Sequence, residues 1–260
     1  MTSVKSEVQV SRENHVGIVE VCRPPHNFFD PELIRQLADA FEALDADASC
    51  RSLVLCAQGS SFSAGANFGD PNRSRIADSP RRVNPIYDEA LRMFACAKPV
   101  VGAIHGPAVG GGLGLALLPD FRVTCAEARF SSNFNRLGFH PGFGLSVTLP
   151  RLVGIQKAAL LFYTGRRIGG TEAVAMGLAD MLVPRDAVRA EAIKLATEIA
   201  GSAPLAVVST RATLRQGLVD AIRKAVARES VEQNAQFKTA DFKEGIAAMA
   251  ERRDPAFTGR

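Results

Sequence analysis

The sequence predicts an α/β fold that is followed by a helical C-terminal region. Short apolar runs with strand character alternate with amphipathic helical patterns through the first 184 residues, at a rough period of 45 residues. Beyond Pro184 the strand patterns stop and only helical patterns remain. We therefore expect an α/β core over residues 1–184 and a helical region over residues 185–260.

The elements expected in the core follow one another in regular order. They are a hairpin (8–10 and 16–21), a helix (31–45), a strand (53–57), a helix (85–96), a strand (100–104), a helix opening at 110–112, two short strands between 121 and 132, and helices at 144–152, 155–163 and 171–177. Asp30 is a good N-cap, and Pro31 suits the first helical position after it. Strands that alternate with helices favour parallel pairing, which a doubly wound sheet would also satisfy.

Four further helical patterns fill the C-terminal region, at 186–200, 205–216, 218–239 and 241–250. Between the first two glycine-containing loops of the core, residues 67–83 are polar and rich in Arg, Asp, Ser and Pro, so we expect a mobile segment there.

Composition argues against several classes of protein. Lys and Arg exceed Asp and Glu by 31 to 27, for a net charge of +4, and no basic block stands out, so no nucleic-acid partner is expected. Residues 1–7 contain no apolar segment and no apolar run is long enough to span a bilayer, which predicts a cytoplasmic protein with no membrane partner. The five cysteines follow no metal or disulfide pattern, so we expect reduced core residues and no metal site.

The glycine triple Gly110–Gly112 directly follows the strand 100–104 and a His-Gly-Pro turn. Each glycine costs about 1 kcal/mol in a helix relative to alanine, so three at a helix start need a reason. One reason is the close approach of backbone N–H groups to a ligand oxygen at a helix N-terminus. The other is tight packing of the helix against the strand.

A second loop, Phe62-Ser63-Ala64-Gly65-Ala66, follows the strand at 53–57. Together with the glycine triple it resembles the enoyl-CoA hydratase/isomerase (crotonase) superfamily over essentially the whole chain. The resemblance implies a spiral of ββα repeats and an acyl-CoA substrate, with no cofactor beyond the coenzyme A of that thioester. It also implies that the N–H groups of Ala66 and Gly111 form an oxyanion hole for the thioester carbonyl, and that the helical region makes contacts in a homotrimer or a dimer of trimers.

An NAD-dependent enzyme is disfavoured, because no G-x-G-x-x-G follows a first strand.

The acids of the family are missing from this chain. Relatives that hydrate use two glutamates, whose positions fall here at Gly114 and Phe134, and a third acidic position falls at Gly142. Hydration by paired carboxylates is therefore not expected. Isomerisation or decarboxylation, which depend mainly on stabilising an enolate, suit the remaining groups better. The alternative is a non-catalytic protein or subunit that binds acyl-CoA.

His140 is the candidate to transfer protons in place of the missing acids, because imidazole titrates near neutral pH and this loop borders the acyl pocket in the family. The alternative is that His140 caps a turn. Tyr87 is a weaker candidate, and His105 is expected to be structural. Asn135 and Arg136 lie beside the same loop, and the sequence does not decide whether their side chains face the pocket.

For coenzyme A, the resemblance implies three groups of contacts. Backbone groups of Ala64 and Ala66 would meet the adenine, and His26 lies where relatives often have a basic residue against phosphate. Met249 and Arg252 match two ligand-contacting positions of the closing helix. The alternative for Arg252 is a solvated helix end, which the helix dipole favours.

Overall fold

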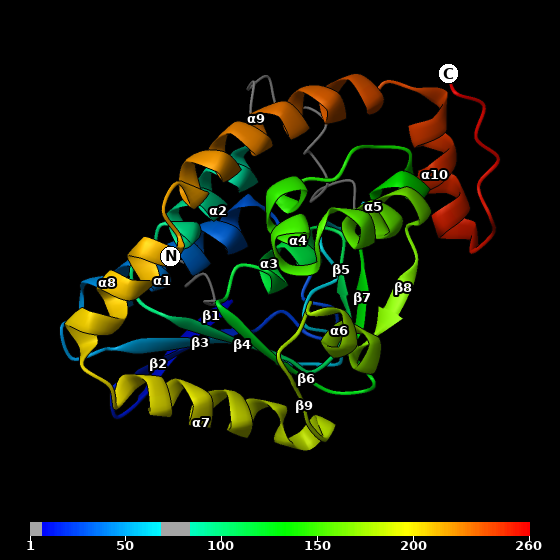
Figure 1. Cartoon of the computed structure of the whole chain (residues 1–260). Coiled ribbons are helices and arrows are strands. Elements are labelled where there is room, and N and C mark those ends of the chain that lie inside the picture. Colours follow the sequence, from blue (N-terminus) through cyan, green and yellow to red (C-terminus); the bar gives the residue numbers. More distant parts are fainter. Residues whose placement is uncertain (1–6, 69–83) are drawn as a thin grey trace, which may run out of the picture.

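A computed structural model describes residues 7–68 and 84–260, and it contains two β-sheets surrounded by helices (Figure 1). The first sheet has the strand order β1 (Val8–Glu13), β2 (Val16–Val21), β3 (Ser52–Ala57), β4 (Val100–Ile104), β6 (Phe121–Thr124) and β9 (Met181–Leu182). The second has the order β5 (Ala108–Val109), β7 (Arg129–Ser131) and β8 (Arg167–Gly169). In the first sheet β1 and β2 form the expected antiparallel hairpin, and every pair from β2 to β9 is parallel.

The chain passes repeatedly from one sheet to the other and then into a helix. β4 in the first sheet leads to β5 in the second and then to α3 (Gly111–Ala116). β6 and β7 repeat this step and lead to the 3₁₀ helix η1 (Asn133–Leu137) and to α4 (Leu145–Val153). This is a spiral of strand–strand–helix turns, and the second sheet excludes the doubly wound alternative.

Helices enclose the sheets. α1 (Pro31–Ala46) packs on α2 (Pro85–Phe94) and on the N-terminal hairpin. The Asp30 side chain caps α1 as predicted, accepting a hydrogen bond of 2.9 Å from the N–H of Leu33. Smaller helices α5 (Ile155–Thr164) and α6 (Gly170–Met176) flank β8 on either side along the chain.

The chain beyond residue 184 is helical, as expected. It contains η2 (Arg185–Ala187), α7 (Val188–Ala200), α8 (Pro204–Leu214), α9 (Leu218–Gln236) and α10 (Ala240–Glu251). α7 lies against strands of the first sheet, where the Ser52 hydroxyl donates to the carbonyl of Ala196 at 2.8 Å. α9 runs beside α2 and α4, and α10 packs on η1 (Figure 1).

Three details differ from the expectations. The hairpin turns at Asn14–His15, with Asn14 at a φ of 52°, so the first strand extends to Glu13. α6 begins at Gly170, one residue before the expected start at 171, and has no side-chain cap. β5, β8 and β9 were not predicted, because strands of two or three residues are too short to show an alternating pattern. Of the segment expected to be mobile, residues 69–83 lie outside the described residues.

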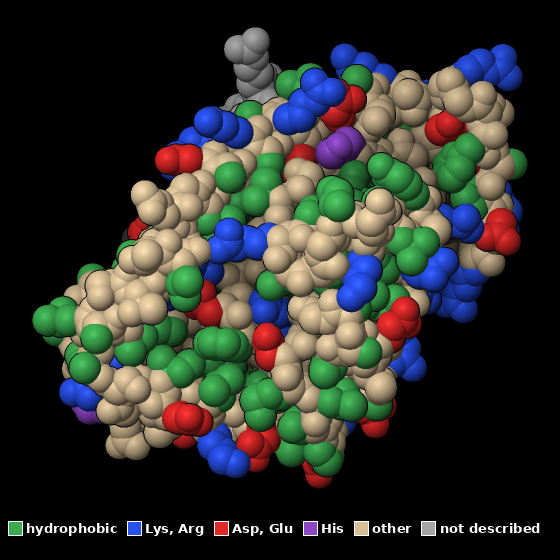
Figure 2. Space-filling view, viewed as in Figure 1, with side chains coloured by type: hydrophobic (Ala, Val, Ile, Leu, Met, Phe, Trp, Pro, Cys, Tyr) green, Lys and Arg blue, Asp and Glu red, His purple; other side chains and the backbone are tan. Residues whose placement is uncertain are grey.

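The five cysteines are free and four of them are buried, which agrees with their interpretation as reduced core residues. On the face seen in Figure 2, Lys and Arg side chains are spread among other residues and form no continuous basic patch. Within residues 7–68 and 84–260 no single helix is both long and apolar enough to cross a membrane, and only a pair bent by 106°, 185–200 with 204–214, meets that test when combined.

The loop after β3 and the loop after β4 are joined by their backbones. The N–H of Val109 donates to the carbonyl of Ser63 at 3.0 Å, and the N–H of Ser63 donates to the carbonyl of Pro107 at 3.1 Å. A Cβ added to Gly112 would lie 2.1 Å from the carbonyl oxygen of Ser63. Close packing is therefore one demonstrated reason for glycine at this helix start.

We predict that Gly112→Ala destabilises the fold by about 1–3 kcal/mol, because the added methyl group meets a backbone oxygen that cannot rotate away. Gly169→Ala is the matched control, since its Cβ would meet nothing closer than 3.6 Å at an ordinary negative φ of −82°. Urea unfolding of both variants measures the difference. Equal stability of the two variants would contradict the close contact of the loops.

Candidate active site

A cavity of about 380 Å³ lies where these two loops meet. Its walls come from both loops, from α2, η1, α9 and α10, and from β8. Four of the residues expected at an acyl-CoA site, Ala64, Ala66, Gly111 and Met249, line it together. These four residues come from segments as far apart in the sequence as positions 64 and 249, and they share one cavity.

The backbone at the junction takes conformations that glycine allows. Gly65 has a φ of 77° and Gly110 a φ of 57°, both in the left-handed half of the map. A Cβ added to Gly65 would lie 3.2 Å from the amide nitrogen of Gly111, so the two loops approach each other without side chains between them. Among the described residues, neither the N–H of Ala66 nor that of Gly111 donates to a protein acceptor.

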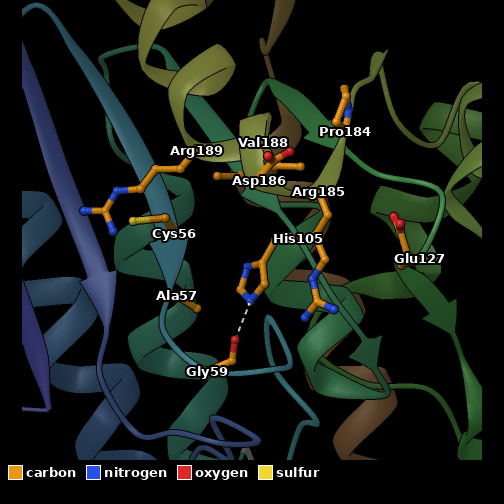
Figure 3. Close-up of a pocket in the computed structure, with 11 residues that line it drawn as sticks. Cys56, Ala57, Gly59, His105, Glu127, Pro184, Arg185, Asp186, Val188 and Arg189 are labelled. Carbon is orange, nitrogen blue, oxygen red and sulfur yellow. Dashed lines mark hydrogen bonds between the residues drawn. The ribbon is translucent and has the colours of Figure 1, made fainter.

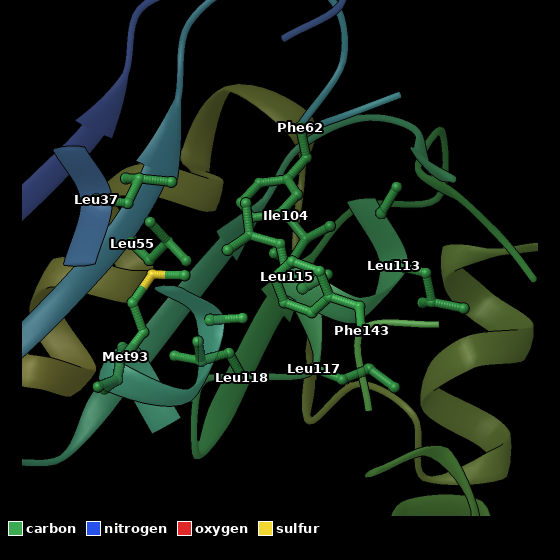
Figure 4. Packing of buried hydrophobic residues seen from close by; sticks show 14 of the residues in the cluster. Leu37, Leu55, Phe62, Met93, Ile104, Leu113, Leu115, Leu117, Leu118 and Phe143 are labelled. Atoms are coloured by element: carbon green, nitrogen blue, oxygen red, sulfur yellow. The ribbon is translucent and has the colours of Figure 1, made fainter. Parts of the chain in front are cut away.

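Phenylalanine rings and a tyrosine occupy the space of the missing acids. A Cβ added to Gly114 would lie 2.7 Å from the Cβ of Phe143, whose side chain packs over α3 (Figure 4). Phe134 presents its own ring to the cavity. A Cβ added to Gly142 would lie 1.9 Å from the hydroxyl oxygen of Tyr87. A carboxylate at Gly114 or Gly142 would therefore need these neighbours to move.

Tyr87 and Gln233 form a buried polar pair in the wall of the cavity. The Tyr87 hydroxyl donates to Oε1 of Gln233 at 2.9 Å and accepts from the N–H of Phe143. The other end of the amide is fixed because Nε2 of Gln233 donates to the carbonyl of His140, also at 2.9 Å. Burial raises the pKa of Tyr87 above its ordinary value, so the hydroxyl keeps its proton at neutral pH.

A buried carboxyl group close enough to affect Tyr87 electrostatically belongs to Glu229 on α9, which does not line the cavity. It accepts hydrogen bonds from the N–H of Gly144 at 2.9 Å, the N–H of Ser146 at 3.1 Å and the Ser146 hydroxyl at 2.5 Å. Glu229 thus caps α4 from another helix and holds the loop that carries Phe143. Burial raises its pKa above the ordinary value, more than these hydrogen bonds lower it.

No Asp, Glu or His is among the described residues that line the cavity. Its polar side chains are asparagines, the Tyr87–Gln233 pair and Arg167, and the rest of the wall is largely apolar and aromatic. The described residues also contain no group of three or more His, Cys, Asp or Glu that could hold a metal ion. Such a wall can bind and polarise a ligand, but it offers no carboxylate to take a proton.

His140, the residue expected to transfer protons, is not among the described residues that line the cavity. Its ring is 2.7 Å from the carbonyl oxygen of Pro141, and it lines a separate hollow beside Phe162 and Tyr163. The alternative of a turn-stabilising histidine fits this contact. Asn135 lines the same separate hollow, and Arg136 pairs with Asp254 at 2.6 Å.

Two of the expected coenzyme contacts also lie outside the cavity wall. His26 places its ring 5.6 Å from that of Phe28, which does line the cavity, and its carbonyl accepts from the N–H of Ala64 at 2.9 Å. Arg252 ends α10 with a φ of 57° and is exposed. His26 is therefore at the edge of the site, whereas Arg252 follows the helix that covers it.

Another hollow, of about 590 Å³, lies at the carboxyl ends of β3 and β4, beside the start of α7 (Figure 3). There the ring of His105 contacts the carbonyl oxygen of Gly59 at 3.1 Å, which is the structural kind of role expected for it. Arg185 and Arg189 face this hollow together with Glu127 and Asp186, so its charges balance. It contains none of the residues that line the acyl cavity.

Comparisons with known proteins identify the family of this chain. A model of the family described as enoyl-CoA hydratase/isomerase matches residues 11–260. A putative enoyl-CoA hydratase of Thermus thermophilus is 35% identical, with 96% of this chain and 100% of the relative covered. The 2,3-dehydroadipyl-CoA hydratase of Escherichia coli is 32% identical, with 98% of this chain and 100% of the relative covered. The crystal structure of an enoyl-CoA hydratase/isomerase from Pseudoalteromonas atlantica superimposes with a TM-score of 0.87 at 31% identity, over 97% of this chain and 100% of that one.

The fold and the matched residues define an acyl-CoA enzyme, and the chain belongs to the enoyl-CoA hydratase/isomerase family. The crotonase-type spiral expected from the two loops is confirmed. Sequence reasoning missed Gln233, Phe143 and Arg167 as parts of the cavity wall. No local motif marks them, because α9, the loop before α4 and β8 reach the cavity only through tertiary packing.

We predict that the stability difference between Glu229→Gln and the natural protein depends on pH. The pKa of Glu229 is raised in the folded protein. Its contribution to the free energy of unfolding is therefore fully present below pH 4.5, the ordinary pKa of a glutamate, and is lost as pH rises through the folded pKa. The Gln variant does not titrate at this position, so it should gain stability relative to the natural protein over that range. Urea unfolding at a series of pH values measures this.

Glu232→Gln is the control, since Glu232 lies on the same helix and pairs with Arg228 near the surface at 2.8 Å. This variant controls for the removal of a carboxylate from α9. A stability difference for Glu229→Gln that stays level across the pH series would show that the pKa of the buried carboxyl group is not raised.

Proposed function

We propose that this protein stabilises the enolate of an acyl-CoA thioester with the N–H groups of Ala66 and Gly111. The observation that carries the proposal is that both amides lack a described acceptor and line one largely apolar cavity, at the contact of two loops. Fixed donors aimed at a developing negative charge stabilise it by several kcal/mol in a site from which water is excluded. The thioester carbonyl oxygen would lie between these two donors.

The lack of a carboxylate in the described wall favours a reaction that needs no protein base. In decarboxylation of a malonyl-type thioester, the bond between the α-carbon and the carboxylate breaks, carbon dioxide leaves, and the electron pair passes to the enolate. A proton then adds to the α-carbon. Hydration and double-bond isomerisation both require a base to take a proton first. Decarboxylation is therefore the reaction that this wall supports best.

Tyr87 is the proposed proton donor to the enolate carbon. Tyr87 is one of the residues that line the cavity, and its raised pKa keeps the hydroxyl protonated. Gln233 orients it by accepting its hydrogen bond in this structure. A carbanion-like carbon formed beside the ring would compete with Gln233 for the same proton.

Coenzyme A is proposed to enter along Ala64 and Ala66, with Met249 of α10 over it. Met249 is 44% exposed, which is high for a methionine and leaves its side chain available at the mouth of the cavity. His26, beside Phe28, remains a candidate phosphate contact at the edge, and Arg252 remains one beyond the end of α10.

A homotrimer or a dimer of trimers is proposed as the functional assembly. α8 has no buried residue, and Leu205 and Leu214 at its two ends are 85% and 69% exposed. Arg211 and Arg215 tie this region to Asp120 at 2.8 and 2.9 Å, so α8 is held in place with its apolar residues outward. Apolar exposure of this kind is typical of a surface that another subunit covers.

The reaction is tested with purified protein and three thioesters: malonyl-CoA, methylmalonyl-CoA and crotonyl-CoA. We expect carbon dioxide and the shortened acyl-CoA from a malonyl-type substrate, and no hydration of crotonyl-CoA beyond the uncatalysed rate. Tight binding of all three without turnover would instead identify an acyl-CoA-binding protein. Hydration or isomerisation at rates of about 1–1000 per second would overturn the proposed chemistry.

We predict that Tyr87→Phe lowers kcat by about 100-fold with KM changed less than about threefold, because it removes a proton donor and little substrate contact. Tyr163→Phe is the matched control: it is the other tyrosine of the chain, is 81% exposed, and should leave kcat unchanged. Circular dichroism of both variants checks that they fold. An unchanged kcat for Tyr87→Phe would remove Tyr87 from the mechanism.

We predict that light scattering after size-exclusion chromatography gives a mass of three or six times the chain mass of 27.7 kDa. Leu205→Lys should shift the mass toward the single chain, because it places a charge in the proposed contact. Lys194→Glu on the outward side of α7, where Lys194 is 75% exposed, is the control. A natural protein that runs as a single chain would contradict the assembly.

A further inference from the structure

One charged side chain, that of Arg167, lines the acyl cavity within the part of the chain that the structure describes. Arg167 begins β8, and neither an ion pair nor a hydrogen bond of its guanidinium to a described residue is found. Most other arginines near the core are paired, as Arg211 and Arg215 are with Asp120. Arg167 is exposed, and a guanidinium with no described ion-pair partner in a largely apolar wall is suited to an anion that comes with a ligand.

The register of the second sheet places Arg167 beside the glycine loop. Val109 pairs with Ser131, and Ser131 pairs with Arg167, so these three residues lie side by side across β5, β7 and β8. With neighbouring strands about 4.8 Å apart, the Cα atoms of Val109 and Arg167 are roughly 10 Å apart. Gly110 and Gly111 directly follow Val109. A long arginine side chain can therefore reach toward a group held a few bonds from the thioester carbonyl.

Asn133 adds a neutral donor on the same side. Its Oδ1 would lie 3.4 Å from a Cβ added to Gly110, and its side chain has no hydrogen bond to a described residue. Ala64, Ala66 and Phe28 reach the cavity from the loops after β3 and β2, whereas Arg167 and Asn133 reach it from β8 and from the start of η1. The cavity thus has donors without described partners at two places: the N–H groups of Ala66 and Gly111, and the side chains of Arg167 and Asn133.

We propose that the acyl group of the substrate ends in a carboxylate, which pairs with Arg167 and accepts a hydrogen bond from Asn133. The substrate class is then the coenzyme A monothioester of a dicarboxylic acid. This inference rests on the proposed acyl-CoA site, but not on the reaction that takes place there. Bidentate pairing of a guanidinium with a carboxylate matches in geometry, and hydrogen bonds to charged groups are stronger than neutral ones.

The test measures binding and needs no turnover. Calorimetry compares succinyl-CoA with butyryl-CoA, which has the same number of acyl carbons but no second carboxylate. We expect the natural protein to bind succinyl-CoA about tenfold more tightly. In Arg167→Gln that preference should disappear while the affinity for butyryl-CoA stays the same, and Arg167→Lys should keep part of it because the charge remains.

Arg166→Gln is the matched control, because this neighbouring arginine contacts the Thr164 hydroxyl at 3.3 Å and does not line the cavity. It should keep the full preference for succinyl-CoA. Glutaryl-CoA and adipyl-CoA extend the series and report which chain length places the carboxylate at Arg167.

Three outcomes would overturn the inference. Equal affinity of the natural protein for the acidic thioesters and for butyryl-CoA would show that no carboxylate is recognised. Equal loss of affinity for succinyl-CoA, butyryl-CoA and free coenzyme A in Arg167→Gln would assign Arg167 to a coenzyme phosphate. A preference that survives Arg167→Gln would assign it to another residue. Failure of all thioesters to bind would instead overturn the acyl-CoA site itself, and failure of turnover alone would affect only the proposed reaction.

Discussion

The rest of the site depends on one constraint, which is the close contact between the backbone of Gly112 and the carbonyl oxygen of Ser63. The spiral brings the loops after β3 and β4 to the same edge of the structure, and hydrogen bonds between Ser63, Pro107 and Val109 lock them together. This contact brings Ala66 and Gly111, which are 45 positions apart in the sequence, to the same cavity, as the proposed binding of one carbonyl oxygen by both amides requires. Glycine is required in both loops, at Gly65 and at Gly112, because a side chain between the loops would push the N–H groups of Ala66 and Gly111 apart.

A second constraint follows from the aromatic rings around that contact. Phe143 lies against Gly114 and Phe134 faces the cavity, so two phenyl rings stand where related hydratases are expected to have acids. Glu229 then fixes the loop of Phe143 from a distance by capping α4. Among the described residues, the buried carboxyl group of Glu229 is thus used for structure, whereas the described wall of the cavity offers neutral donors and the guanidinium of Arg167. This division is the physical basis for proposing chemistry that forms an enolate without a protein base.

Tyr87, Gln233 and Arg167 link the site to distant parts of the chain. Gln233 lies on α9 and Tyr87 on α2, and their hydrogen bond joins helices separated by 146 positions in the sequence. Arg167 arrives on a strand of three residues whose register alone aligns it with Val109. A change in the packing of α9 or β8 would therefore alter the polar groups of the cavity without touching the two glycine-containing loops.

The sequence by itself determined the order of the longer strands and helices, the cap at Asp30, the helical C-terminal region and the two loops that carry the candidate amides. These features are local, since capping, periodicity and the conformational freedom of glycine act within a few residues. Only the tertiary structure decided that the strands form two sheets, that His140 lies outside the cavity, and that Gln233, Phe143 and Arg167 line its wall. Those facts depend on which distant surfaces pack together, and a side chain's direction relative to a distant element has no signature in its neighbouring residues.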